Sequence, residues 1–278
     1  MYWIISVLVA ILISISTASG MTDKPNVKAG LGETDSDSHK SLSRDETERF
    51  EQVYNLNPDG SVKAANISGN IRVSTWESPQ VRLVAVKTAE NAEILKDMEL
   101  KIESTQESFY VKVKYRDRDR DNDEYRNYKN YGSVEFELTV PRTAKLTGIS
   151  SVSGDITIDG TDNYTKASSV SGDVKGMNLG GTAKLSSVSG IVEADFSNVA
   201  AGSDIKLSSV SGGVILKLPS YAGASVKAST VSGKITNDFG LKVDEGKYVG
   251  ASMKGSFGDG SVAVRMSTVS GRINVAKQ

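Results

Sequence analysis

Residues 166–174 read Lys-Ala-Ser-Ser-Val-Ser-Gly-Asp-Val, and the central Val-Ser-Gly of this stretch recurs along the chain. The six copies place their glycines at Gly154, Gly172, Gly190, Gly212, Gly233 and Gly271. Successive glycines are separated by 18, 18, 22, 21 and 38 residues. Because 38 is twice 19, we expect a degenerate copy near Ser252. A period of this length is typical of solenoid proteins.

The residues around each glycine indicate strands. Two residues after it, the side chain is always apolar and β-branched: Ile156, Val174, Val192, Val214, Ile235 and Ile273. Short β-branched segments, a glycine bend at a fixed place and no helical periodicity predict one coil of parallel strands per repeat. The expected fold is all-β, a single-stranded parallel β-helix or solenoid with about 18–22 residues per coil. The β-branched residues would stack inside as ladders, and glycine would allow the turn.

Pairs of small hydroxyl residues precede each glycine by three and four positions. They are Ser150-Ser151, Ser168-Ser169, Ser186-Ser187, Ser208-Ser209, Ser229-Thr230 and Ser267-Thr268. Stacked in register, these side chains would share hydroxyl hydrogen bonds from coil to coil. A nucleophilic role is disfavoured because no partner base accompanies them.

The segment before the repeats extends the same pattern. Residues 66–73 form a diverged copy, and strands are expected at 81–86, 100–103, 109–115 and 134–140. Residues 89–98 favour one short helix, with Ala92, Leu95 and Met98 on its apolar face. Trp76 is expected to pack over the open end of the coil.

Several of these segments together resemble a known family. They are Gly69-Asn70-Ile71-Arg72-Val73 followed by Trp76, then Leu138-Thr139-Val140-Pro141, the tandem Val-Ser-Gly copies, and Gly258-Asp259-Gly260 ahead of the last copy. The combination, over about residues 50–278, resembles the bacterial β-strand-repeat family known as putative adhesins, a domain of unknown function. The resemblance implies an exported β-solenoid tied to the cell envelope, and it supplies no catalytic residues.

The N-terminal part predicts export. Residues 1–20 carry no charge, an apolar run covers 4–15, and small residues follow it, which is typical of a signal peptide; an uncleaved anchor is the alternative. Residues 21–46 are polar and are expected to form a disordered tether. The solenoid domain would then cover 47–278, with repeat signatures over 148–278 and a charged loop inserted at 116–132. We expect a periplasmic, cell-surface or extracellular protein.

The amino-acid composition disfavours several kinds of site chemistry in this protein. The 278 residues include no Cys and a single His, His39, which lies in the expected tether. Zinc fingers, thiol nucleophiles and most histidine-dependent catalysis are therefore disfavoured, and we expect no cofactor and no metal. The net charge of −1 gives no reason to expect nucleic-acid binding.

A basic residue stands six positions before most signature glycines: Lys166, Lys184, Lys206, Lys227 and Arg265, with Gly148 breaking the series. In-register stacking would form a basic column with about 4.8 Å between coils. One interpretation is a binding site for an anionic polymer such as an acidic envelope polysaccharide. The other is a solvated face whose lysines discourage aggregation.

Two carboxylates share one repeat position. Asp155 and Asp173 could form the acidic pair of a carbohydrate-active enzyme. The later members of that position are Ile191, Gly213, Lys234 and Arg272, which is typical of variable surface. Alternating aspartates in the 116–132 loop suggest calcium, but the EF-hand pattern fails at Asn122 and Tyr128, so a charged hairpin loop is favoured.

The sequence therefore predicts a non-catalytic, adhesin-like envelope or surface module of unknown ligand. The alternatives are a carbohydrate-active β-helix enzyme and an envelope-stress scaffold that binds another protein. Because the last copy at Gly271 is followed by only a few residues, we expect an open C-terminal coil that supports self-association.

Overall fold

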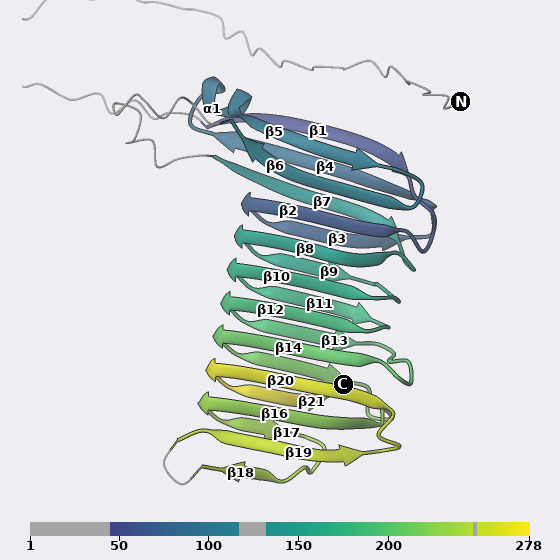
Figure 1. Ribbon diagram of the computed structural model, residues 1–278, viewed down its shortest axis with the longest axis vertical. Helices are drawn as coiled ribbons and strands as arrows, with labels where there is room; N and C mark the ends of the chain where they lie inside the picture. The colour runs from purple at the N-terminus through teal and green to yellow at the C-terminus, as the bar shows by residue number, and fades with distance from the viewer. Residues whose placement is uncertain (1–44, 117–131, 247–248) are drawn as a thin grey trace, which may run out of the picture. The chain divides into compact units, whose positions relative to one another are not determined.

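The computed structural model describes residues 45–116, 132–246 and 249–278. These residues form two mixed β-sheets and one short helix, α1 (Ala92–Asp97) (Figure 1). Sheet A consists, from edge to edge, of β1 (Glu46–Asn55), β4 (Gln80–Ala89), β7 (Ser133–Pro141), β3 (Ile71–Trp76), β9 (Ile156–Asp159), β11 (Val174–Leu179), β13 (Val192–Phe196), β15 (Val214–Leu218), β21 (Ile273–Lys277) and β17 (Ile235–Asn237).

Sheet B consists, in the same way, of β18 (Val243–Glu245), β19 (Ala251–Phe257), β16 (Ala224–Ser232), β20 (Val262–Ser270), β14 (Asp204–Ser211), β12 (Ala183–Ser189), β10 (Thr165–Ser171), β8 (Lys145–Ser153), β2 (Ser61–Ser68), β6 (Ser108–Tyr115) and β5 (Met98–Ser104). The expectation of an all-β protein with one short helix is confirmed, and each of the four strands expected upstream of the repeats is present as β4, β5, β6 or β7.

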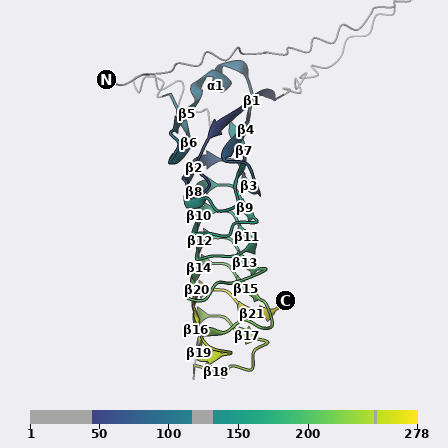
Figure 2. The same cartoon turned by 90° about the vertical axis from the view of Figure 1, so that its right-hand side faces the viewer.

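Each signature joins a strand of sheet B to a strand of sheet A. In one copy β10 ends at Ser171, the chain turns at Gly172, and β11 begins at Val174. Figure 2 shows the two sheets facing each other, with every coil contributing one strand to each. Neighbouring coils pair in parallel and in register, so that Ser168 lies between Ser150 and Ser186. The β-branched residues that follow the glycines are 6% exposed or less and form the expected inward ladder.

The signature glycine is required by the close approach of successive turns. A Cβ on Gly172 would collide with the carbonyl oxygen of Gly154, and the same clash recurs from turn to turn. Because the obstacle is backbone, it cannot swing aside as a side chain would. Each coil of the stack therefore needs a glycine at this turn.

Both ends of the sheets depart from the expected parallel pattern. Strands β1, β4 and β7 pair antiparallel in sheet A, as do β5 and β6 in sheet B. At the other end β19 runs antiparallel to both β16 and β18. The segment around Ser252 is therefore a reversed strand that places Ser252 opposite Ser229, where we had expected one more parallel copy.

Trp76 does not cover the end of a coil, as we had expected. It closes β3, which lies between β7 and β9, and its indole Nε1 donates to the carbonyl oxygen of Gln80 at 2.8 Å. Three further strands of sheet A, β7, β4 and β1, lie beyond it. The prediction failed because these antiparallel strands extend the sheet past the first coil.

The strand order also departs from chain order. The coil β20–β21, which carries the last signature, lies between β14–β15 and β16–β17. The open coil expected at the C-terminal end of the stack is therefore an interior coil with a neighbour on each side. Self-association as such stays untested, but this coil does not offer a free edge for it.

Some predictions fall outside the described residues: the signal peptide at 1–20, residues 21–44 of the expected tether with His39, and residues 117–131 of the charged loop. Strand β1 begins at Glu46, one residue before the expected start of the domain. Within the part of the chain that the structure describes, no helix is long and apolar enough to cross a membrane.

Candidate ligand-binding face

The outer face of sheet B carries three parallel columns of side chains. Along β10, Lys166, Ser168 and Val170 point outward, whereas Ala167 and Ser169 are buried, because side chains alternate along a strand. In-register pairing repeats this arrangement in each coil. The result is a basic column of Lys166, Lys184, Lys206, Arg265 and Lys227, a serine column of Ser150, Ser168, Ser186, Ser208, Ser267 and Ser229, and a valine column of Val152, Val170, Val188, Val210, Val269 and Val231.

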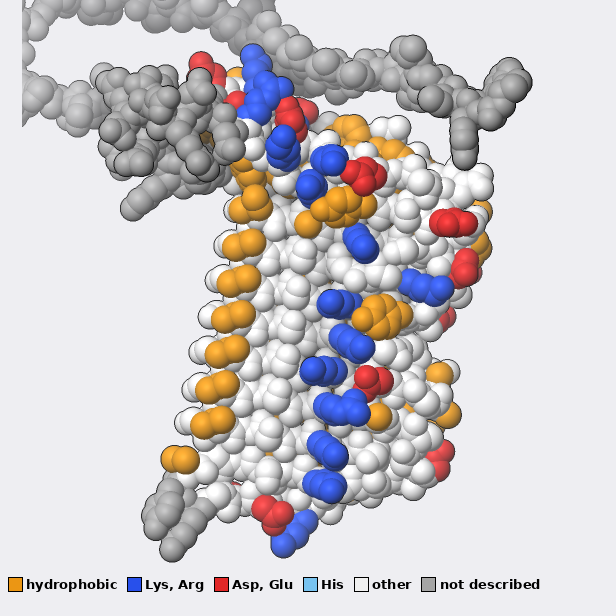
Figure 3. Space-filling view, in the orientation of Figure 1, with side chains coloured by type: hydrophobic (Ala, Val, Ile, Leu, Met, Phe, Trp, Pro, Cys, Tyr) orange, Lys and Arg blue, Asp and Glu red, His pale blue; other side chains and the backbone are white. Residues whose placement is uncertain are grey.

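Figure 3 shows this face directly. The valine column is the orange row along one edge, the basic column is the blue row, and small white side chains lie between them. Serine is smaller than both valine and lysine, so the face is hollowed beside the valine column. The hollow has a volume of about 750 Å³. It is lined by the valine column, by the serine pairs of β8, β10, β12 and β14, and by Ser229, Ser267 and Thr268. We call it the serine groove.

The five basic residues singled out in the sequence lie side by side. Lys184 pairs in register with Lys166 and Lys206, and Arg265 lies between Lys206 and Lys227. Lys254 of β19, opposite Lys227, extends the column, and Lys63 of β2 stands opposite Gly148 beyond the break. Lys63 could have been found from the sequence, since it also lies six residues before a glycine, Gly69. Lys254 could not, because its strand runs the other way.

Most of the basic column lacks an acidic partner. Arg265 contacts Asp204 at 2.5 Å, and Lys184 lies 5.6 Å from the ring centre of Tyr164. Among the described residues no ion pair involves Lys166, Lys206 or Lys227. Like charges on adjacent strands repel, so this face favours an anion that would offset them.

Lys175 and Lys217 on the outer face of sheet A differ from the basic column because they have an acidic partner. Glu193 lies between Lys217 and Lys175, with oxygen to Nζ distances of 2.7 and 3.6 Å. Burial opposes ionisation of Glu193, but the hydrogen bond from Lys217 and the two positive charges outweigh burial and hold the pKa of this carboxyl below its ordinary value. Lys175 and Lys217 are thus compensated by an acidic side chain, whereas Lys166, Lys206 and Lys227 are not paired with one among the described residues.

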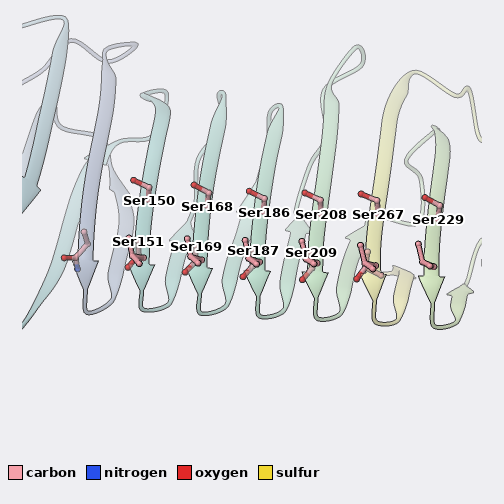
Figure 4. A pocket seen from close by; sticks show the side chains of 18 residues that line it. Ser150, Ser151, Ser168, Ser169, Ser186, Ser187, Ser208, Ser209, Ser229 and Ser267 are labelled. Carbon is pink, nitrogen blue, oxygen red and sulfur yellow. The ribbon is translucent and has the colours of Figure 1, made fainter. Parts of the chain in front are cut away.

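The two serines of each coil have different roles. Figure 4 shows them as two rows, one along the middle of the strands and one near their ends. The second residue of each pair is buried and donates to a glycine carbonyl of the neighbouring coil: Ser169 to Gly154 at 3.0 Å, Ser187 to Gly172 at 2.8 Å, Ser209 to Gly190 at 2.9 Å, Thr268 to Gly212 at 2.9 Å and Thr230 to Gly271 at 3.1 Å. The expected hydroxyl-to-hydroxyl ladder is thus a hydroxyl-to-carbonyl ladder.

The first serine of each pair faces the groove. Ser150 Oγ makes one long contact of 3.4 Å with the carbonyl oxygen of Ala64. Among the described residues, the hydroxyls of Ser168, Ser186, Ser208, Ser229 and Ser267 have no hydrogen-bond partner. A row of free hydroxyls that can donate or accept is suited to a ligand rich in polar groups.

The valine column was not identified from the sequence. Its members are between 46% and 60% exposed, and Ile67 of β2 continues it opposite Val152 at 45%. Strict alternation would have revealed it, because Val170 lies four residues after the outward Lys166. The column gives the groove an aliphatic wall.

The paired carboxylates have a structural role at the turns. The backbone N–H of Asp173 donates to Asp155 Oδ1 at 2.8 Å, and that of Ile191 donates to Asp173 Oδ1 at 2.7 Å. Asn70 Oδ1 accepts from the N–H of Asp155 in the same way. Each side chain thus holds the turn of the next coil. No group of three or more potential metal ligands occurs among the described residues.

Stacked in-register coils with a regular outer face define an all-β strand-repeat protein that presents an extended surface groove. The chain belongs to the Toastrack DUF4097 family, whose model matches residues 13–276, and this confirms the resemblance drawn from the sequence. The family is a domain of unknown function.

Three solved structures of bacterial proteins match the chain at low sequence identity. A "putative cell adhesion protein" from Clostridium sporogenes is 14% identical, with 83% of this chain and 100% of that chain covered and a TM-score of 0.49. A "putative adhesin" from Bacteroides fragilis is 13% identical, with 82% and 97% covered and a TM-score of 0.45. A "putative lipid binding protein" from Parabacteroides distasonis is 13% identical, with 84% and 97% covered and a TM-score of 0.32. No curated protein matches the chain.

Proposed function

We propose that this protein is a non-catalytic, adhesin-like binding module of the cell envelope or cell surface, and that the outer face of sheet B binds a linear anionic polymer such as an acidic polysaccharide. The observation that carries the proposal is the basic column, whose members lie in register while most of them have no acidic partner among the described residues.

The three columns suit such a ligand in different ways. The lysines supply one positive charge per coil, at about 4.8 Å from strand to strand. The free hydroxyls of the serine column can bond to sugar hydroxyls, and the valine column can contact the apolar C–H groups of a sugar ring. Each contact is weak, but their repetition along one chain makes the total binding strong.

Export of the module is part of the proposal. The apolar run at 4–15 followed by small residues supports a signal peptide, and an acidic polysaccharide of the envelope would be met only outside the cytoplasm.

The test compares two triple variants of equal charge. Lys184→Gln, Lys206→Gln and Lys227→Gln neutralise most of the column, whereas Lys96→Gln, Lys175→Gln and Lys277→Gln remove the same charge from α1 and from sheet A. Calorimetric titration with polygalacturonate should show at least about a tenfold loss of affinity and a weaker salt dependence for the column variant only. Equal binding by both variants, equal binding of neutral dextran by the unmodified protein, or no binding to polygalacturonate would each overturn the proposal.

A further inference from the structure

The coil β20–β21 is inserted between two coils that precede it in the chain. Strand β20 pairs in parallel with β14 on one side and with β16 on the other. Strand β21 pairs in the same way with β15 and β17. The coils β14–β15 and β16–β17 are therefore joined in the stack only through β20–β21, which comes later in the chain. We call the space between these two coils the slot.

The coil β20–β21 is held in the slot by backbone pairing on both sides and by the packing of its apolar side chains. Both of its walls carry the register of the inserted coil, so that Ser208, Ser267 and Ser229 align across the three strands. The inserted coil places five apolar side chains in the core, each 2% exposed or less: Val262, Val264, Met266, Ile273 and Val275. These contacts are the same whichever molecule supplies the coil.

A tight turn leads from β19 into the inserted coil. Gly258 and Gly260 lie in this turn at φ +58° and +69°, a region that glycine enters without cost. A change of these dihedral angles alone would direct β20–β21 away from its own slot and leave the coil itself unaltered. Exchange of an identical element through such a hinge is a route to dimers.

We propose that the slot between β14–β15 and β16–β17 also accepts the coil β20–β21 of a second copy of this chain, giving a reciprocal coil-swapped dimer. The partner is fixed by the slot itself, since the inserted coil already fits it in register on both walls. The inference is independent of the ligand proposed for sheet B.

Cysteine pairs distinguish a swapped dimer from any other, because the natural chain has no cysteine. Ser208→Cys with Ser267→Cys places a pair across β14 and β20, where paired Cα atoms are close enough for a disulfide. This disulfide lies within one chain in the monomer and between two chains in the swapped dimer. The control pair, Ser186→Cys with Ser208→Cys, joins β12 and β14, which both precede the hinge, so its disulfide stays within one chain in either state.

The full chain is unfolded in urea, refolded over a range of protein concentrations, oxidised, and run on a non-reducing gel beside a light-scattering measurement of mass. We expect an intrachain disulfide at low concentration and a covalent dimer that increases with concentration for the first pair only. Monomeric mass throughout, or a dimer in which the first pair stays intrachain, would overturn the proposal.

A hinge variant sharpens the test. A Cβ on Gly258 would meet Gly223 Cα at 2.6 Å and strain the closed turn, so Gly258→Ala should raise the dimer fraction several-fold at equal concentration. Gly240→Ala is the control: its φ of +70° is as unfavourable for alanine, but its Cβ meets nothing within 4 Å and it lies outside the hinge. An equal response of both variants would contradict the hinge.

Discussion

Asp155 and Asp173 are joined by a hydrogen bond from the backbone N–H of Asp173 to Oδ1 of Asp155, at 2.8 Å, although 18 residues separate them. The carboxylate replaces a turn hydrogen bond that the next coil cannot make with its own backbone. Asp155 and Asp173, the two carboxylates that suggested an acidic catalytic site, thus take part in the hydrogen bonding that links adjacent turns.

This relationship predicts a difference between two substitutions of one residue. Asp155→Asn keeps an oxygen acceptor, whereas Asp155→Ala leaves the N–H of Asp173 without its protein partner. We expect Asp155→Ala to lower the free energy of unfolding by about 1 kcal/mol and Asp155→Asn by less than half of that. Urea denaturation measures both, and equal losses would show that the acceptor has no role.

Alanine substitutions at two adjacent glycines should differ sharply in their effect on stability. A Cβ on Gly212 would collide with the carbonyl oxygen of Gly190, whereas a Cβ on Gly213 would meet only Arg272 O, at 3.6 Å. Gly212→Ala should therefore cost about 3 kcal/mol or prevent folding, and Gly213→Ala should be nearly neutral. Thermal unfolding followed by circular dichroism compares them; a tolerated Gly212→Ala would refute the argument from close turns.

Adjacent serines provide the same kind of comparison. Ser187 Oγ donates to Gly172 O at 2.8 Å from a buried position, whereas Ser186 faces the groove. Ser187→Ala leaves a carbonyl oxygen unpaired and should cost about 1 kcal/mol in urea denaturation. Ser186→Ala should change stability by less than about 0.5 kcal/mol. The reverse order would mean that the two rows had been assigned to the wrong roles.

Glu193 should make the stability of the folded protein depend on pH. Its pKa is lowered in the folded state because the hydrogen bond from Lys217 and the two lysine charges outweigh the opposing effect of burial. A lowered folded pKa contributes stability above the ordinary pKa of glutamate, and this contribution is lost as the pH falls through the lowered value. Glu193→Gln should therefore be less stable than the unmodified protein at pH 7, and the difference should shrink below about pH 4.

The control for this experiment is Glu107→Gln, which removes an exposed carboxyl. Thermal unfolding at several pH values should show no comparable pH-dependent difference for it. A difference in unfolding temperature between Glu193→Gln and the unmodified protein that stays constant down to pH 3 would argue against the ion pairs as the origin of the pH dependence.

The repeating part of the fold could be predicted because its physical constraints are local. A glycine at each turn, a β-branched residue two positions later and a lysine six positions earlier all follow from one coil and its nearest neighbours. The in-register stacking of the five basic residues could be predicted for this reason, and strict alternation of side chains would have yielded the valine column as well.

The order of the coils could not be predicted in this way. Gly212 and Gly233 are 21 residues apart, a spacing like that of coils that do stack directly, and nothing local reports that a third coil lies between them. Whether Lys206 or Lys227 has an acidic partner also depends on neighbours that are distant in sequence. These features follow from the assembled stack alone.

The inserted coil also constrains how the molecule folds. Residues 224–237 are made before residues 262–277 but need them as a neighbour, and the exposed edge of β14 offers β16 the same register in the meantime. Early direct stacking of β16 on β14 would be a kinetic trap, since the two strands must separate before the later coil can enter. Folding of this end should thus be slower than the local geometry of each coil suggests, with its slow phase governed by the escape from a near-native pairing.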